Sequence, residues 1–132
     1  MTAPLDPAGP LRVLVVDADE RIRESLAGLL AIGRRCIVVG TASHPESALS
    51  LIAAEPPDVI VVDPRLPEVD AGRAFIARAR ELAPSVRVLV MSWSDSLGHD
   101  SIISGADAFV RKTFRPRELI DAVIAAGQGA PN

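Results

Sequence analysis

The chain has 132 residues, a length that suits one domain with its own hydrophobic core and leaves little room for two. A hydrophobic fraction of 48% and a charged fraction of 23% are typical of a folded globular chain and exclude a disordered one. The formal net charge of -3 argues against direct nucleic-acid binding by this domain, and one cysteine cannot form an internal disulfide.

The N-terminal residues show no secretory signal pattern, and no apolar run approaches the roughly 20 residues of a membrane span. These features predict a cytoplasmic protein with no membrane role of its own. Residues 1–10 contain three prolines without an apolar period, so we expect a flexible lead-in there. The folded domain is predicted over 11–127, and 128–132 form a tail or a truncated linker.

Short apolar runs alternate with stretches of helical spacing along the folded part. The runs predict five strands, at 12–16, 36–40, 59–62, 86–91 and 108–110. The intervening stretches predict helices at about 19–31, from Pro45 to the prolines at 56–57, at about 71–82, at about 97–104, and from about 115 onward.

Strands that alternate with helices predict an α/β fold, because parallel strands need crossover connections. We expect a three-layer sandwich around a doubly wound, five-stranded parallel sheet with the flavodoxin-like order 2-1-3-4-5. Ligands of such sheets bind beyond the carboxyl ends of the strands. The residues that end the predicted strands are therefore the candidate site.

Polar residues stand at four of these ends: Asp17, Asp63, Ser92 and Lys112. Two carboxylates in one crevice repel each other, so the pair predicts either a divalent cation or a raised carboxyl pKa. The ammonium of Lys112 helps to balance their charge, and the hydroxyl of Ser92 can donate a hydrogen bond to a bound anion. The four groups together are suited to holding a phosphoryl group.

Four segments carry a resemblance to a known family: LVVD at 14–17, VVDPRLPEVD at 61–70, VLVMS at 88–92 and GADAFVRK at 105–112. In this order and at this spacing they resemble the receiver, or phosphoacceptor, domain of two-component response regulators. The resemblance runs from about residue 11 to residue 127 without an insertion. It implies a signalling domain in a phosphorelay, controlled by phosphorylation.

The resemblance also implies roles for individual residues. Asp63 accepts a phosphoryl group from a sensor histidine kinase or a phosphotransfer protein, so the domain is the substrate of its own chemistry rather than an enzyme acting on others. Mg²⁺ is held by Asp63, by Asp17 through water and by the backbone carbonyl of Arg65. Lys112 and Ser92 contact the transferred group.

In the family, Ser92 and Phe109 act as a switch that changes the surface of the fourth helix, the fifth strand and the fifth helix. That surface contacts partners, and members of the family often form homodimers through the fourth and fifth helices. The last helix resembles that of regulators that continue into a helix-turn-helix output domain, so a role in transcription through such a domain stays open.

The sequence departs from the family at several positions. Ala18 stands where a second acid normally binds Mg²⁺, which predicts a weakened affinity for this ion. Asp19, one residue further on, could reach the metal only if the loop is remodelled. Trp93 replaces a small residue and is predicted either to shield Asp63 or to act in packing. Thr113 replaces a proline and changes how Lys112 is aimed, and Ala71 replaces a glycine at the end of the acceptor motif.

Two of three alternatives remain open at this point. A pseudo-receiver that binds partners with little or no phosphorylation would explain the departures at Ala18, Trp93 and Thr113. The retained Asp63, Ser92 and Lys112 argue against a full loss of the chemistry. Asp17 could cap the first helix instead of binding metal. A flavodoxin-like flavin binder is set aside, because the acidic segment 17–20 would repel a phosphate.

Overall fold

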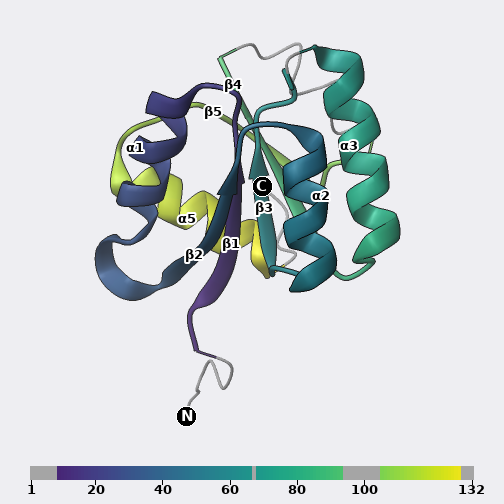
Figure 1. Ribbon diagram of the computed structural model, residues 1–132. Coiled ribbons are helices and arrows are strands. Elements are labelled where there is room, and N and C mark those ends of the chain that lie inside the picture. Colours follow the sequence, from purple (N-terminus) through teal and green to yellow (C-terminus); the bar gives the residue numbers. More distant parts are fainter. Residues whose placement is uncertain (1–8, 67, 94–104, 129–132) are drawn as a thin grey trace.

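The computed structural model describes residues 9–66, 68–93 and 105–128. Within them, five parallel strands form one sheet in the order β2-β1-β3-β4-β5 (Figure 1). The strands are β1 (Leu11–Val16), β2 (Cys36–Ala42), β3 (Val59–Val62), β4 (Arg87–Ser92) and β5 (Ala108–Arg111). The predicted fold class and strand order are confirmed.

Helices connect the strands and cover both faces of the sheet. They are α1 (Glu20–Leu30), the short 3-10 helix η1 (Ile32–Arg34), α2 (Pro45–Ala54), α3 (Val69–Leu82) and α5 (Pro116–Gly127). The helix predicted at 97–104 lies outside the described residues, as do nearly all of the predicted lead-in and tail. The domain limits at 10 and 127 therefore stay predictions.

Several elements begin or end away from their predicted bounds. β2 continues two residues beyond the predicted end, because its pairing with β1 extends to the partners Val16 and Ala42. β4 runs to Ser92, so this residue is the last of the strand rather than the first after it. α3 begins at Val69, and its first turn closes where the Gly72 amide donates to the Glu68 carbonyl at 3.1 Å.

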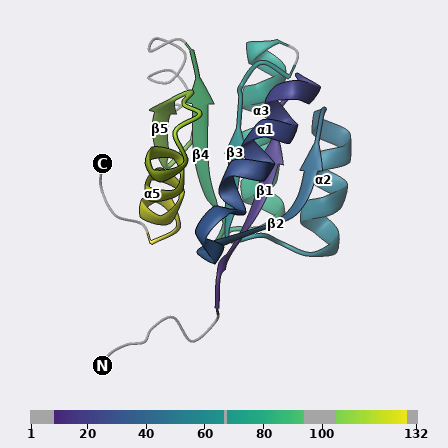
Figure 2. The same ribbon diagram turned by 90° about the vertical axis from the view of Figure 1, so that its left-hand side faces the viewer.

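Alternate residues of the central strands point to opposite faces of the sheet. Val13 and Val15 pack into a core with α1 and α5, whereas Leu14 and Val16 pack into a second core with α2 and α3. Figures 1 and 2 show these two pairs of helices on opposite sides of the sheet. Burial on both faces explains why the β1 and β3 sequences are continuously apolar.

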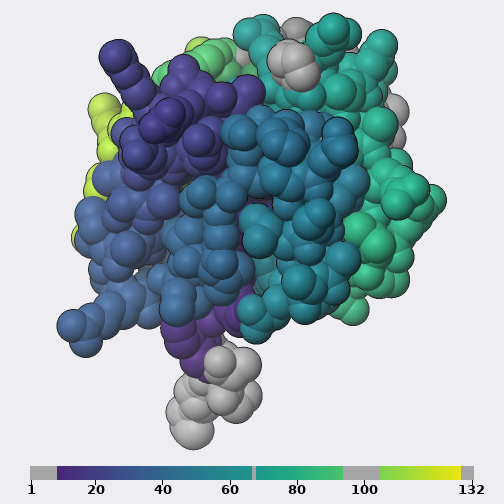
Figure 3. All heavy atoms as spheres, viewed as in Figure 1, coloured from purple at the N-terminus to yellow at the C-terminus, as the bar shows by residue number. Residues whose placement is uncertain are grey.

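One edge of the sheet is formed by β2, which lies between α1 and α2 on the face seen in Figure 3. Ile37 and Val39 of this strand remain 48% and 37% exposed. The pairing of β1 with β2 shifts register between Val13 and Leu14, so Val39 lies in a bulge. A bulge on an edge strand hinders the addition of a further strand.

Arg80 joins α3 to the starts of β4 and β5. Its guanidinium donates from Nε to the Gly105 carbonyl at 2.8 Å and from Nη1 to the Val86 carbonyl at 3.1 Å, and it forms an ion pair with Asp107. Asp107 in turn accepts a hydrogen bond from the amide of Val88 at 2.7 Å. These contacts of Arg80 with Val86, Gly105 and Asp107, called the Arg80 clamp below, therefore fix the point at which the chain enters β5.

No helix in the described part of the chain is long and apolar enough to cross a membrane.

Candidate functional site

The carboxyl ends of the strands bring together the four polar residues that the sequence singled out. Asp17, Asp63, Ser92 and Lys112 are the buried polar residues of the described ranges, with exposed fractions of 4%, 8%, 2% and 8%. Burial of charged groups is unfavourable unless they are paired. Their shared location at one edge of the sheet therefore indicates a built site rather than loop residues left at the surface.

Backbone hydrogen bonds continue beyond the strands and hold these residues in place. The Asp17 amide donates to the carbonyl of Ala42, and the Asp63 amide donates to the carbonyl of Val16, each at 3.1 Å. The Lys112 amide likewise donates to the Ser92 carbonyl at 3.1 Å. The rigid sheet thus determines where each functional side chain starts.

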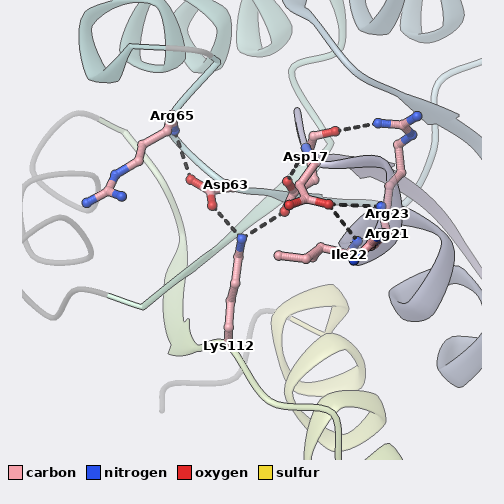
Figure 4. A network of polar contacts seen from close by, with 8 residues as sticks. Asp17, Arg21, Ile22, Arg23, Asp63, Arg65 and Lys112 are labelled. Carbon is pink, nitrogen blue, oxygen red and sulfur yellow. Dashed lines mark hydrogen bonds and ion pairs between the residues drawn. The ribbon is translucent and has the colours of Figure 1, made fainter.

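Lys112 forms ion pairs with both aspartates (Figure 4). Its Nζ atom lies 2.9 Å from Oδ2 of Asp17 and 2.5 Å from Oδ2 of Asp63. Burial by itself lowers the pKa of Lys112, but the hydrogen bonds and attraction of the two carboxylates outweigh burial and raise it. The ammonium therefore stays charged at neutral pH and balances one of the two negative charges.

The loop after β1 is held by contacts to every polar atom of Asp17. Besides the contacts above, Oδ1 of Asp17 accepts from the amide of Asp19 at 2.9 Å, and the Asp17 carbonyl accepts from Nη1 of Arg23 at 2.8 Å (Figure 4). The side chain of Asp19 caps α1 by accepting from the amides of Arg21 and Ile22. The alternative that Asp17 is the helix cap is wrong, and Asp19 is occupied in that role.

The loop after β3 carries the predicted acceptor. Oδ1 of Asp63 accepts a hydrogen bond from the amide of Arg65 at 2.9 Å, so both carboxylate oxygens of Asp63 have a partner among the described residues. Gly72 of α3 packs against this loop, because a Cβ atom there would lie 1.8 Å from the carbonyl oxygen of Pro64. Sequence reasoning missed Gly72, since the family glycine was sought at position 71.

The predicted switch residues lie on two neighbouring strands. Ser92 ends β4 and is buried, whereas Phe109 of β5 is half-buried and packs against the core shared with α2 and α3. Residues 94–104, which lie between these two positions and include the predicted fourth helix, are outside the described residues. The switch therefore stays a prediction.

Trp93 lies at the rim of the site. Its side chain is 50% exposed, and Nζ of Lys112 lies 5.7 Å from the centroid of the ring, within the range of a cation–π contact. The ring of Phe114, which is 43% exposed, lies 6.1 Å away between centroids. Thr113, between Lys112 and Phe114, accepts a hydrogen bond through Oγ1 from the Arg115 amide at 3.2 Å.

The donor set of the site fits a magnesium ion, because Mg²⁺ prefers carboxylate and carbonyl oxygens. The two carboxylates of Asp17 and Asp63 share one ion-pair partner, the ammonium of Lys112. Over residues 9–66, 68–93 and 105–128, no three acidic, histidine or cysteine side chains gather in a metal-binding group. Position 18, directly after Asp17, is alanine and adds no carboxylate to this set.

A family model described as the response regulator receiver domain matches residues 13–124. The chain is 33% identical over 122 residues to the transcriptional regulatory protein LiaR of Bacillus subtilis, covering 92% of this chain and 58% of that protein. It is 34% identical over 123 residues to a protein-glutamate methylesterase/protein-glutamine glutaminase of Cereibacter sphaeroides, covering 93% of this chain and 32% of that enzyme. The chain thus spans between about a third and six tenths of these relatives.

Solved structures give the same likeness. The signal receiver domain of NarL from Mycobacterium tuberculosis superposes with a TM-score of 0.78 at 31% identity, covering 92% of this chain and 98% of that one. The response regulator domain of CheB from Thermotoga maritima gives a TM-score of 0.77 at 26% identity, covering 92% and 99%.

Proposed function

The chain belongs to the response regulator receiver domain family, and from this premise we propose that Asp63 accepts a phosphoryl group from a sensor histidine kinase or a phosphotransfer protein. Receiver domains act in two-component signalling and are phosphorylated on an aspartate. One observation carries the proposal for Asp63. Its carboxylate is buried at the end of β3, in the segment 61–70 that resembles the family's acceptor motif, and lies 2.5 Å from the Lys112 ammonium.

The proposed reaction is a transfer to a carboxylate oxygen. An oxygen of Asp63 forms a bond to phosphorus while the bond from phosphorus to the donor's nitrogen or oxygen breaks, and the electron pair of that bond leaves with the donor. The product is an acyl phosphate. The chain is its own catalyst in this reaction, and its output is a signal rather than a released product.

Lys112 and Ser92 are proposed to contact the transferred group. In the resting site the ammonium is shared between Asp17 and Asp63. The arriving group brings further negative charge, and the ammonium already lies beside the carboxylate that is proposed to receive it. Positive groups that are oriented before the reaction stabilise developing charge without reorganising.

Mg²⁺, which receiver domains generally bind for phosphorylation, supplies positive charge that offsets repulsion between the carboxylate and the phosphoryl oxygens. We propose that Asp17, Asp63 and the Arg65 carbonyl hold it, with affinity weakened by Ala18. Asp19 does not replace the missing acid, because its side chain caps α1. Calorimetry without a phosphodonor tests this: the Ala18→Asp variant should bind Mg²⁺ more tightly than the wild type, and equal affinities contradict the proposal.

Trp93 is proposed to slow the entry of water and of small phosphodonors to Asp63. Its ring stands beside Lys112 and contacts Phe114, so it covers one side of the approach to the acceptor. Trp93→Ala should therefore shorten the lifetime of the phosphorylated form. An unchanged lifetime would leave packing as the role of this residue.

The pseudo-receiver is the less favoured alternative, because acceptor, lysine and strand-end serine are all retained and brought together. The output stays a proposal. LiaR is named as a transcriptional regulator and the relative from Cereibacter sphaeroides as an esterase, so receivers of this kind serve different outputs. We propose that phosphorylation acts through the surface formed by the predicted fourth helix, β5 and α5, and that a homodimer forms through the fourth and fifth helices of the same surface.

Intact mass after incubation with acetyl phosphate and Mg²⁺ tests the proposed function. The wild type should gain one phosphoryl group, and Asp63→Asn should gain none. If only Ala18→Asp gains mass, the natural chain is a phosphorylation-impaired interaction module.

A further inference from the structure

Gly72 makes an unusually close contact with the backbone of the acceptor loop. A Cβ atom at this position would lie 1.8 Å from the carbonyl oxygen of Pro64, 2.5 Å from its carbonyl carbon and 2.8 Å from its Cα atom. All three are backbone atoms, so no side chain can rotate out of the way. The φ angle of Gly72 lies outside the left-handed region, which means that space rather than backbone conformation requires glycine here.

The contacted residue stands between the two groups that define the acceptor. Pro64 directly follows Asp63 and directly precedes Arg65, whose amide holds Oδ1 of Asp63 at 2.9 Å. A shift of the Pro64 carbonyl therefore moves both the acceptor and the amide that orients it. The family glycine at position 71 is alanine in this chain, and the close approach occurs one residue later.

We propose that Gly72 is a positioning residue for phosphoryl transfer: its bare Cα lets α3 pack against Pro64 and so sets the place of the Asp63 carboxylate. The inference rests on the proposed function of Asp63 as the acceptor. Gly72 itself touches none of the reacting atoms, and it acts through the loop.

The size of the effect follows from the geometry. Real Cβ contacts essentially never fall below 3.0 Å, so alanine at 72 must push the Pro64 carbonyl away by about 1.2 Å, the difference between 3.0 and 1.8 Å. A misplacement of about 1 Å costs roughly 100-fold in rate for reactions that depend on orientation. Gly72→Ala is therefore expected to be phosphorylated about 100-fold more slowly per folded molecule.

Gly28 provides the matched control, because it is also a helical glycine but has no atom within 4 Å of an added Cβ. Gly28→Ala should leave the rate unchanged and slightly stabilise the fold, since alanine favours helix. The double variant Gly28→Ala/Gly72→Ala then serves as a more stable background in which to measure the effect of Gly72.

The experiment follows the rate of phosphorylation by acetyl phosphate over a range of donor concentrations, corrected for the folded fraction from circular dichroism. We expect the maximal rate of phosphorylation to fall in Gly72→Ala and in the double variant. We also expect the backbone amide signal of Arg65 in ¹H–¹⁵N spectra to shift, a change that simple destabilisation of the fold does not produce. Gly28→Ala should match the wild type in both measurements.

Two results would overturn the inference. One is a folded Gly72→Ala protein with the wild-type rate and an unshifted Arg65 signal. The other is failure of both Gly72 variants to fold even at low temperature, which would make the glycine necessary for the fold and not for aiming the acceptor. If the wild type itself gains no phosphoryl group, the proposed function fails, and the Arg65 signal still decides whether Gly72 positions the loop.

Discussion

Replacing Lys112 with methionine removes the ammonium while keeping a side chain of similar length. Asp17 and Asp63, with 4% and 8% exposure, are then left facing each other without a counter-charge. Loss of one partner of a buried ion pair costs about 3 to 5 kcal/mol, because the other charge stays buried. For 132 residues, at roughly 3 to 5 °C per kcal/mol, Lys112→Met should lower Tm by about 9 to 25 °C.

The cost of this substitution should depend on pH with a defined sign. In the variant, the two buried carboxylates repel each other only while both are charged, so the substitution should cost more stability at neutral pH than in acid. In the wild type, the pKa of Lys112 is raised above its ordinary value of 10.5, chiefly by Asp63 and Asp17 acting against burial. The stability gained from that shift is present below pH 10.5 and is lost as pH rises through the folded pKa.

Urea denaturation at pH 4 and pH 7, followed by circular dichroism, measures the effect. The substitution should cost clearly more at pH 7 than at pH 4. Arg115→Met is the control, because Arg115 forms an exposed ion pair with Glu118, and such pairs contribute about 1 kcal/mol or less. A loss of unfolding free energy below about 0.5 kcal/mol for Lys112→Met, or an equal loss at both pH values, would refute a stabilising buried ion triad of Asp17, Asp63 and Lys112.

Further substitutions test other parts of the account. Asp19→Ala removes the cap of α1 and should lower the free energy of unfolding by about 1 kcal/mol, measured by urea denaturation, whereas Glu20→Ala should change it less. Arg80→Met removes the clamp on β4 and β5 and should cost about 2 to 3 kcal/mol in the same assay, because Arg80 makes charge-assisted bonds to partly buried groups. Arg78→Met, on the exposed side of α3, should stay within about 0.5 kcal/mol of the wild type, and equal costs at 78 and 80 would contradict the clamp.

The fold was predictable because its signals are local and repeated. The apolar run at 59–62 was predicted with the bounds that β3 has, and Pro45 begins α2 as its place in a first helical turn indicates. Other bounds depend on tertiary contacts, as where pairing with β1 carries β2 on to Ala42. Such contacts between distant segments leave no local mark in the sequence.

The candidate site likewise contains residues that the sequence identifies and contacts that only the folded structure reveals. Asp17, Asp63, Ser92 and Lys112 could be named from the sequence, because parallel strands end at one edge of a sheet and the strand ends were clear. The capping role of Asp19 was missed, although an aspartate just before a helical stretch is a known helix start signal. The contact of Gly72 with Pro64 had no such signal, since only the packing of α3 on the loop reveals it.

The central claim is that Asp63 carries the phosphoryl group, and chemical trapping tests it most directly. Borohydride reduces an aspartyl phosphate to homoserine, and tandem mass spectrometry of the digested protein locates the reduced residue. After incubation with acetyl phosphate and Mg²⁺, the account predicts homoserine at position 63 in the wild type. Homoserine at another aspartate, or a stable phosphoryl group on a hydroxyl side chain, would contradict it.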